Sequence, residues 1–346
     1  MKHWSSPRWD GPGPEITETL FSIIRVCHYW HDIGMHRLYS HLHLSKTTFE
    51  HIEHISDVIE RQGYGEYVKR VDVRFDLLSS RWDVLPLLRL LNAVSDLRVL
   101  TFIPPWDSAD FANWYINIDV VAVFAAHPFA QLAAVLEHRF KHSLSALSVI
   151  GLSPRRFEVG LLSNVPLKLL ELSLSPDGTF IPPEVLQTVQ TLTLDVTTFH
   201  PTKPFDYYFP SLTTLALIRI PEDEAHHWGN FISLHSSNLK CLRLSSNLQL
   251  SDPIFRSLIL TATNLSTVAL DKFDMTDLAP DTGDDVFASV QRLIVPDLAP
   301  ANVDYFMKVF PALKEVSLTE VVSKYHAMKL RLGERGILVC TLGESG

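Results

Sequence analysis

A nine-residue pattern near the middle of the chain most constrains the fold. Residues 239–247 place Leu239, Leu242 and Leu244 at the first, fourth and sixth positions and Asn247 at the ninth. The apolar spacing of this frame occurs ten times, and the copies start at Val68, Leu97, Leu144, Leu169, Val189, Leu212, Leu239, Leu265, Val290 and Leu313. Apolar residues at alternate positions predict a short strand with one buried face, and a single repeat cannot bury that face alone. The pattern therefore predicts an array of stacked repeats.

The spacing of the frames identifies the kind of repeat. Successive starts lie 29, 47, 25, 20, 23, 27, 26, 25 and 23 residues apart. All but one of these spacings fall within the window of about 20–29 residues that is typical of leucine-rich repeats. We therefore predict an α/β fold, an irregular leucine-rich-repeat solenoid in which a parallel sheet carries helices on its outer side. The array is expected to be irregular because only the frame at Leu239 has the ninth-position asparagine.

The repeats define the expected organisation of the chain. We expect a disordered leader at residues 1–11, short helices at 12–44 and the repeats at 45–346. The 47-residue gap predicts an insert at about residues 103–143. Two helices, at 109–126 and 129–142, are expected within it, separated by Pro128, because proline disfavours helix at the residue before it. Leu42 and Leu44 predict a strand before the first frame, and residues 336–340 predict a last one.

The segment before the repeats has a helical pattern of its own. Pro14 suits the first position of a helix, and Ile16, Leu20, Ile23, Ile24 and Cys27 follow it at helical spacing. Pro14-Glu15-Ile16 with Leu20-Phe21, and then Val26-Cys27 with Trp30, resemble the opening and closing helices of an F-box. The resemblance covers residues 12–44. It departs from the family because Pro12-Gly13 replaces the usual Leu-Pro and because only four residues separate Phe21 from Val26, where F-boxes have a middle helix.

The chain therefore resembles an F-box/leucine-rich-repeat protein with a shortened, degenerate F-box. The resemblance implies a substrate-recognition subunit of a cullin–RING ubiquitin ligase of the SCF type. In that role the ligase adaptor is a partner and an unidentified protein target binds the repeats. The residues that match the adaptor-binding motif are Pro14, Glu15, Ile16, Leu20, Phe21, Val26, Cys27 and Trp30. The alternatives are a stand-alone protein-binding scaffold that does not dock to the ligase, and a helical cap whose only role is to cover the first repeat.

The strand pattern also indicates which residues face a target. Alternation along a strand makes the third, fifth and seventh positions of each frame point away from the apolar core. Solenoids use such extended faces for binding. Among the charged residues at these positions, those predicted to bind the target are Arg70, Asp72, Arg74, Glu171, Asp195, Arg243 and Asp271.

Other function classes find little support in the sequence. The G-x-x-x-x-G-K-[ST], G-x-G-x-x-G and G-x-S-x-G motifs are absent, so we expect no enzyme and no cofactor. Seven histidines lie between His28 and His54, and a metal-dependent enzyme is the alternative they raise. Without paired cysteines or H-E-x-x-H, we interpret them as polar-face residues and expect no metal.

Charge and cysteine content indicate the expected compartment and partners. The net charge of −9 disfavours a general nucleic-acid-binding face, and no apolar stretch suits a membrane span. Three widely spaced cysteines and no visible signal peptide predict a reducing compartment, cytoplasmic or nuclear.

Overall fold

The computed structural model describes most strands of the expected array. The described residues are 22, 25, 27–44, 49–74, 85–103, 131–149, 162, 164–173, 181–196, 205–218, 225–245, 259–260, 262–270, 286–296, 307–318 and 325–341. The chain forms two compact units. The first unit comprises residues 1–167 and 180–185, and the second unit comprises 168–179 and 186–346.

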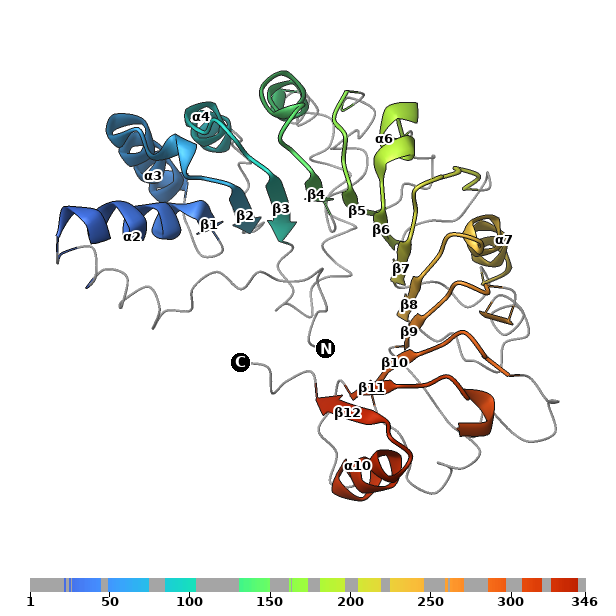
Figure 1. Cartoon of the computed structure of the whole chain (residues 1–346). Helices are drawn as coiled ribbons and strands as arrows, with labels where there is room; N and C mark the ends of the chain where they lie inside the picture. Colours follow the sequence, from blue (N-terminus) through green and yellow to red (C-terminus); the bar gives the residue numbers. More distant parts are fainter. Residues whose placement is uncertain are drawn as a thin grey trace. The chain divides into compact units, whose positions relative to one another are not determined.

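Parallel strands in chain order form the sheet of each unit (Figure 1). The first unit has β1 His41–Leu44, β2 Arg70–Arg74, β3 Val99–Ile103 and β4 Ala146–Val149. The second unit has β5 Leu169–Ser173, β6 Thr191–Asp195, β7 Thr214–Ile218, β8 Cys241–Ser245, β9 Thr267–Leu270, β10 Arg292–Val295, β11 Glu315–Leu318 and β12 Leu338–Thr341. Ten strands fall on the ten frames, and β1 and β12 are the extra strands expected at either end. The leucine-rich-repeat architecture is confirmed.

Helices connect several of the strands. They are α2 His28–Ser40, α3 Phe49–Gln62, α4 Leu85–Ala93, α6 Pro183–Thr188, α7 Ala225–His235 and α10 Tyr325–Glu334, with a 3-10 helix η1 at Tyr64–Glu66. Residues 131–140 are also helical, as expected for the end of the insert. The expected helix at 109–126 and the expected leader lie outside the described residues. Among the described residues, no helix is both long and apolar enough to span a membrane.

The register between strands repeats from one repeat to the next. Leu42 pairs with Val71 and Val71 with Leu100 in the first unit, so fourth positions align with fourth positions. At the strand starts, one carbonyl accepts two successive backbone N–H groups, as the Lys69 oxygen does from Arg98 and Val99, at 2.8 and 3.1 Å. The carbonyl of Lys168 does the same in the second unit. This constant register stacks the apolar residues into a continuous core.

The frame predicted to start at Leu169 lies two residues too far along the chain. Leu170 pairs with Leu192, and Leu172 pairs with Leu194, so the repeat starts at Leu167. Leu167, Leu170 and Leu172 are buried, whereas Leu169 is part-exposed. The leucines from 167 to 174 satisfy the apolar spacing in two phases, and pairing with β6 selects between them. The correction makes the array more regular there, because starts at 144, 167 and 189 are 23 and 22 residues apart.

The inward side chains make the core of each unit. In the first unit Val71, Leu100 and Phe102 are at most 2% exposed, and α3 and α4 pack together beside the sheet (Figure 1). In the second unit the corresponding Leu215 and Leu242 are fully buried, and Trp228 of α7 is 1% exposed. The opposite, outward face of each sheet carries the positions that sequence analysis assigned to binding.

Candidate functional site

Helix α2 presents an apolar surface to solvent. Tyr29, Trp30 and Ile33 are 70%, 46% and 41% exposed. Residues three and four apart lie next to each other on a helix, so Ile33 adjoins both rings. The rings of Tyr29 and Trp30 meet edge to face with centroids 5.9 Å apart. We call these three residues the α2 apolar face.

Of the eight residues expected to contact an adaptor, the structure describes two, and both lie in this face or next to it. Cys27 is exposed and immediately precedes α2, and Trp30 belongs to the face itself. The other six, Pro14, Glu15, Ile16, Leu20, Phe21 and Val26, lie outside the described residues. Sequence analysis did not identify Tyr29 or Ile33 as surface residues, although Ile33 follows Tyr29 and Trp30 at helical spacings of four and three residues.

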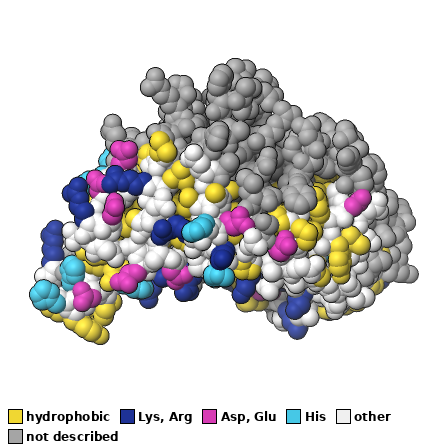
Figure 2. Space-filling model, turned by 90° about the horizontal axis from the view of Figure 1, so that it is seen from above, with side chains coloured by type: hydrophobic (Ala, Val, Ile, Leu, Met, Phe, Trp, Pro, Cys, Tyr) yellow, Lys and Arg dark blue, Asp and Glu magenta, His cyan; other side chains and the backbone are white. Residues whose placement is uncertain are grey.

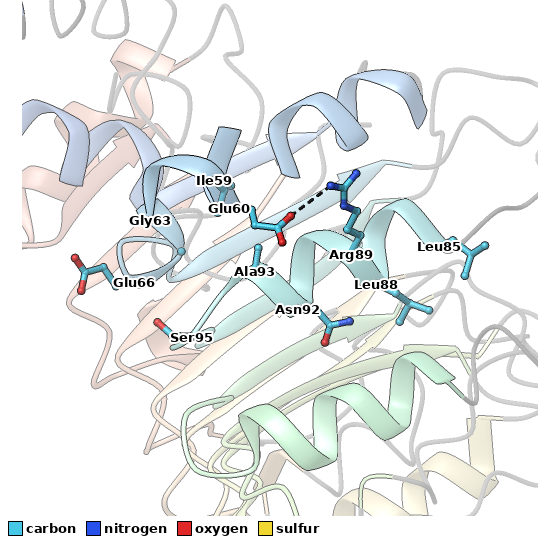
Figure 3. A pocket seen from close by; sticks show the side chains of 11 residues that line it. Ile59, Glu60, Gly63, Glu66, Leu85, Leu88, Arg89, Asn92, Ala93 and Ser95 are labelled. Carbon is cyan, nitrogen blue, oxygen red and sulfur yellow. Dashed lines mark hydrogen bonds and ion pairs between the residues drawn. The ribbon is translucent and has the colours of Figure 1, made fainter. Parts of the chain in front are cut away.

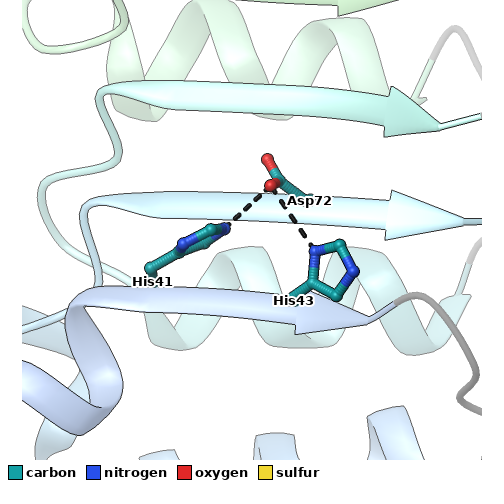
Figure 4. Close-up of side chains that lie close together, drawn as sticks. All are labelled: His41, His43 and Asp72. Carbon is teal, nitrogen blue, oxygen red and sulfur yellow. Dashed lines mark hydrogen bonds and ion pairs between the residues drawn. The ribbon is translucent and has the colours of Figure 1, made fainter. Parts of the chain in front are cut away.

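The outward face of the first unit begins with four polar side chains. His41 Nε2 lies 2.8 Å from Asp72 Oδ2, and His43 Nδ1 lies 3.6 Å from the same oxygen (Figure 4). Arg70 donates from Nε to the other oxygen, Asp72 Oδ1, at 2.8 Å. Strand pairing explains the arrangement, because His41 lies opposite Arg70 and His43 lies opposite Asp72. We call His41, His43 and Asp72 the histidine–aspartate cluster.

The environment of Asp72 keeps its carboxylate charged. Burial alone raises the pKa of this group, since the side chain is only 5% exposed. Hydrogen bonds from His41, His43 and Arg70, with the charge of Arg70, outweigh burial and hold the pKa of Asp72 well below its ordinary value. A buried carboxylate beside two imidazoles is an arrangement that can bind a cation.

The outward face of the second unit has a different character. Its alternate positions include many small residues, such as Thr191, Thr193 and Ala216 on β6 and β7. An ion pair lies toward the far end, where Arg292 Nε is 3.0 Å from Glu315 Oε1. Ser317 donates to the same carboxylate oxygen at 3.0 Å. This ion pair is half-exposed and joins β10 to β11.

A part-buried thiol, Cys241, lies on the same face. Burial raises the pKa of Cys241, and the charges of Arg292 and Arg243 act in the opposite direction. Arg243, one of the predicted target-binding residues, lies two residues after this thiol on β8 and is part-exposed. A raised pKa disfavours the thiolate, which is the nucleophilic form of cysteine.

The structure places the predicted charged residues less openly than expected. Asp72, Glu171 and Asp195 are 3%, 6% and 1% exposed, although all three point outward. Parallel strands lie about 4.8 Å apart, so the neighbouring strands on both sides can cover an outward side chain. Thr193, for example, donates to Glu171 at 3.3 Å. Arg70 is part-exposed.

The remaining two residues of that set are not described as side chains. The Arg74 side chain and all of Asp271 lie outside the described residues. The target-binding role of the whole set stays a prediction.

A groove of about 870 Å³ lies between α3 and α4 of the first unit (Figure 3). Arg89 crosses its edge and pairs with Asp57 at 2.6 Å and with Glu60 at 3.3 Å. At its floor a side chain on Gly65 would collide with the carbonyl of Ala93, so glycine permits the close approach of the turn to α4. The charged groups at this edge already pair with each other, and we assign the groove no ligand.

The surface charge does not form a field of one sign. On the face seen in Figure 2, acidic, basic and histidine side chains of the described residues lie interspersed. Such a surface is less suited to a polyanion than a continuous basic stripe.

Comparison with known proteins adds no family assignment. No protein-family model matches the sequence. No curated protein matches it either. Among solved structures, the chain is similar to one in the crystal structure of the Rad7 and Elc1 complex in yeast, at 10% sequence identity and a TM-score of 0.40 over 88% of each chain. A likeness of this extent carries no argument, so the functional case rests on the geometry described above.

Proposed function

We propose that the chain is a substrate-recognition subunit of a cullin–RING ubiquitin ligase. The α2 apolar face docks on the ligase adaptor, and the outward faces of the repeats bind the protein target. The observation that carries this proposal is the exposure of Tyr29, Trp30 and Ile33 in the segment whose sequence resembles the closing helix of an F-box.

The physical case for docking starts from the cost of exposed aromatic rings. Aromatic side chains dominate binding energetics because they bury a large area with few rotatable bonds. Burying the α2 apolar face against a partner removes this apolar area from water, at a gain of roughly 25 cal/mol per Å². The charge and histidine content around the face provides the polar rim that interfaces typically have.

The mechanism requires no bond chemistry from this chain. Holding a target near the ubiquitin-charged enzyme raises its effective concentration and converts an encounter between two molecules into a step within one complex. The repeats supply a rigid surface for the target, and α2 leads directly into the first strand of that surface.

A co-purification experiment tests the proposal. The full chain is expressed with the adaptor, and wild type is compared with the double variant Trp30→Ala/Ile33→Ala. The matched control is Tyr208→Ala/Leu330→Ala, which removes two apolar side chains that are 50% and 67% exposed elsewhere on the surface. Loss of an interface aromatic typically costs about 2 kcal/mol or more, roughly a thirtyfold loss of affinity.

The outcomes separate the two candidate functions. Capture of the adaptor by wild type and by the control, but not by the α2 variant, supports the ligase subunit. Failure of wild type to capture the adaptor favours the stand-alone scaffold, because the repeat faces then act without ligase docking.

A further inference from the structure

The histidine–aspartate cluster has the geometry of a metal site. His41 and His43 alternate on β1, so both imidazoles project from one face of the strand. The in-register pairing of β1 with β2 brings Asp72 opposite His43 (Figure 4). One nitrogen from each histidine and one oxygen from Asp72 all lie within 4.8 Å of one another.

The two distances from Asp72 are close to those in a tetrahedral site for an ion of zinc size. Zinc binds imidazole nitrogen at about 2.0–2.1 Å and carboxylate oxygen at about 2.0–2.2 Å, which separates tetrahedral ligand atoms by roughly 3.4 Å. The two separations measured from Asp72 Oδ2, 2.8 Å to His41 and 3.6 Å to His43, lie on either side of that value. The ligand atoms lie within 4.8 Å of one another, so the imidazoles must turn toward a common ion to complete the site.

The surroundings of Asp72 favour one defined ligand atom. Arg70 engages Oδ1 at 2.8 Å, so Oδ2 is the oxygen that faces the histidines. Hydrogen bonding of a ligating carboxylate from its far side is a common feature of metal sites. The buried Asp72 is fixed, while the His43 side chain is 53% exposed and leaves a route for an ion from solvent.

We propose that His41, His43 and Asp72 bind one zinc ion. Two imidazoles and one carboxylate suit zinc and neighbouring divalent transition metals, whereas magnesium and calcium prefer ligand sets made of oxygen. Three protein ligands leave a fourth position open to water. The ion ties β1, the strand that continues from α2, to β2, the first strand of the ten frames. If the proposed function holds, the open position also faces the target.

Metal binding by the full chain tests this proposal. The purified protein is stripped with a chelator and dialysed against zinc chloride alone, and bound zinc is measured by elemental analysis. Wild type is expected to bind one equivalent, and His43→Ala and Asp72→Asn are each expected to weaken binding at least tenfold. His54→Ala is the control, because it removes an exposed histidine of α3 and is expected to bind zinc like wild type.

A second readout separates ligand loss from misfolding. His43 is half-exposed, so its removal is expected to leave the circular dichroism spectrum unchanged. Zinc is expected to raise the melting temperature of wild type and of His54→Ala but not of His43→Ala, because an ion that binds only the folded state stabilises it. The proposal is overturned if folded wild type binds no more zinc than the His41→Ala/His43→Ala variant. It is also overturned if His54→Ala loses as much zinc binding as His43→Ala.

The zinc and adaptor experiments fail independently. A chain that binds zinc at this cluster but does not capture the adaptor retains the metal site and loses the ligase function. A chain that captures the adaptor through α2 but binds no zinc retains the ligase function and loses the metal site.

Discussion

The outward faces of the two units share one backbone geometry and differ in chemistry. Both are built from parallel strands in constant register, with alternate residues directed away from the core. The first unit uses these positions for a compact cluster around the buried Asp72. The second unit carries many small residues there beside the separate buried carboxylates Glu171 and Asp195, and it has a half-exposed ion pair near its end. The repeat thus determines the position of an outward residue but not the type of its side chain.

The inward faces show the opposite behaviour. Leu100 on β3 and Leu242 on β8 occupy the same position in their frames, and both are fully buried. Truncation of either leucine to alanine is expected to cost about 2–5 kcal/mol in the free energy of unfolding, because a cavity replaces close-packed contacts. Denaturant titration of Leu100→Ala and Leu242→Ala measures this. If only one variant loses less than about 1 kcal/mol in the free energy of unfolding, the two positions are not equivalent.

Substitution of the buried carboxylate of the first unit is expected to give the next largest loss of stability. Asp72→Asn removes the charge that Arg70 and the two histidines surround, and the Arg70 guanidinium loses a charged acceptor. Loss of a buried charged partner is expected to cost about 1–3 kcal/mol. Denaturant titration in chelator-treated buffer isolates this effect from metal binding. An unfolding free energy equal to that of wild type contradicts a structural role for the cluster.

The histidines of the two units also differ. His43 is half-exposed, whereas His235 of α7 is 1% exposed. The His235 ring donates from Nδ1 to the carbonyl of Phe231 at 2.8 Å and accepts at Nε2 from the backbone N–H of Phe209 at 2.9 Å. Both nitrogens are therefore satisfied in the neutral form. Burial lowers the pKa of His235, and the hydrogen bond to Phe231 opposes the shift.

Acidification is expected to destabilise the second unit through His235. The ordinary histidine pKa is 6.5, so below that pH the unfolded chain binds a proton that the folded state resists. Stability conferred by the neutral ring is present above that pH and is lost as pH falls.

Unfolding free energies measured between about pH 7.5 and 5 check this expectation. The difference between wild type and His235→Gln is expected to shrink as pH falls. A difference that stays constant over this range shows that His235 does not couple protonation to folding.

The ion pair of the second unit is expected to give the smallest effect. Arg292 and Glu315 have side chains that are 40% and 28% exposed, so water screens their attraction. Glu315→Gln is expected to cost about 1 kcal/mol or less, well below Asp72→Asn. Thermal melts at low and high salt measure it. If Glu315→Gln loses as much stability as Asp72→Asn, the charged groups of the two outward faces do not differ in their contribution to folding.

Local spacing is enough to predict the repeats but not always their phase. Ten frames locate ten strands because burial of alternate residues imposes the same apolar pattern on every repeat. The frame at Leu169 fails because leucines occupy both phases there, and only pairing with Leu192 and Leu194 resolves them. That pairing is a property of two strands together and is not encoded in either alone.

The candidate sites depend still more on contacts distant in sequence. The sequence predicts outward residues at Arg70 and Asp72 and polar faces at His41 and His43. It does not predict that they lie together, because that depends on the register of two strands that are separated in the chain. Burial of Asp195 likewise follows from neighbouring strands and not from its own frame. Trp30 is identified by its resemblance to a motif, whereas the exposure of Tyr29 and Ile33 emerges only from the packing of α2.

Titration of purified adaptor against the purified full chain tests the central claim most directly. The account predicts saturable one-to-one binding to wild type and to Tyr208→Ala/Leu330→Ala, and an affinity at least tenfold weaker for Trp30→Ala/Ile33→Ala. Equal affinity for all three proteins, or no binding to folded wild type, contradicts the assignment of the α2 apolar face as the docking surface.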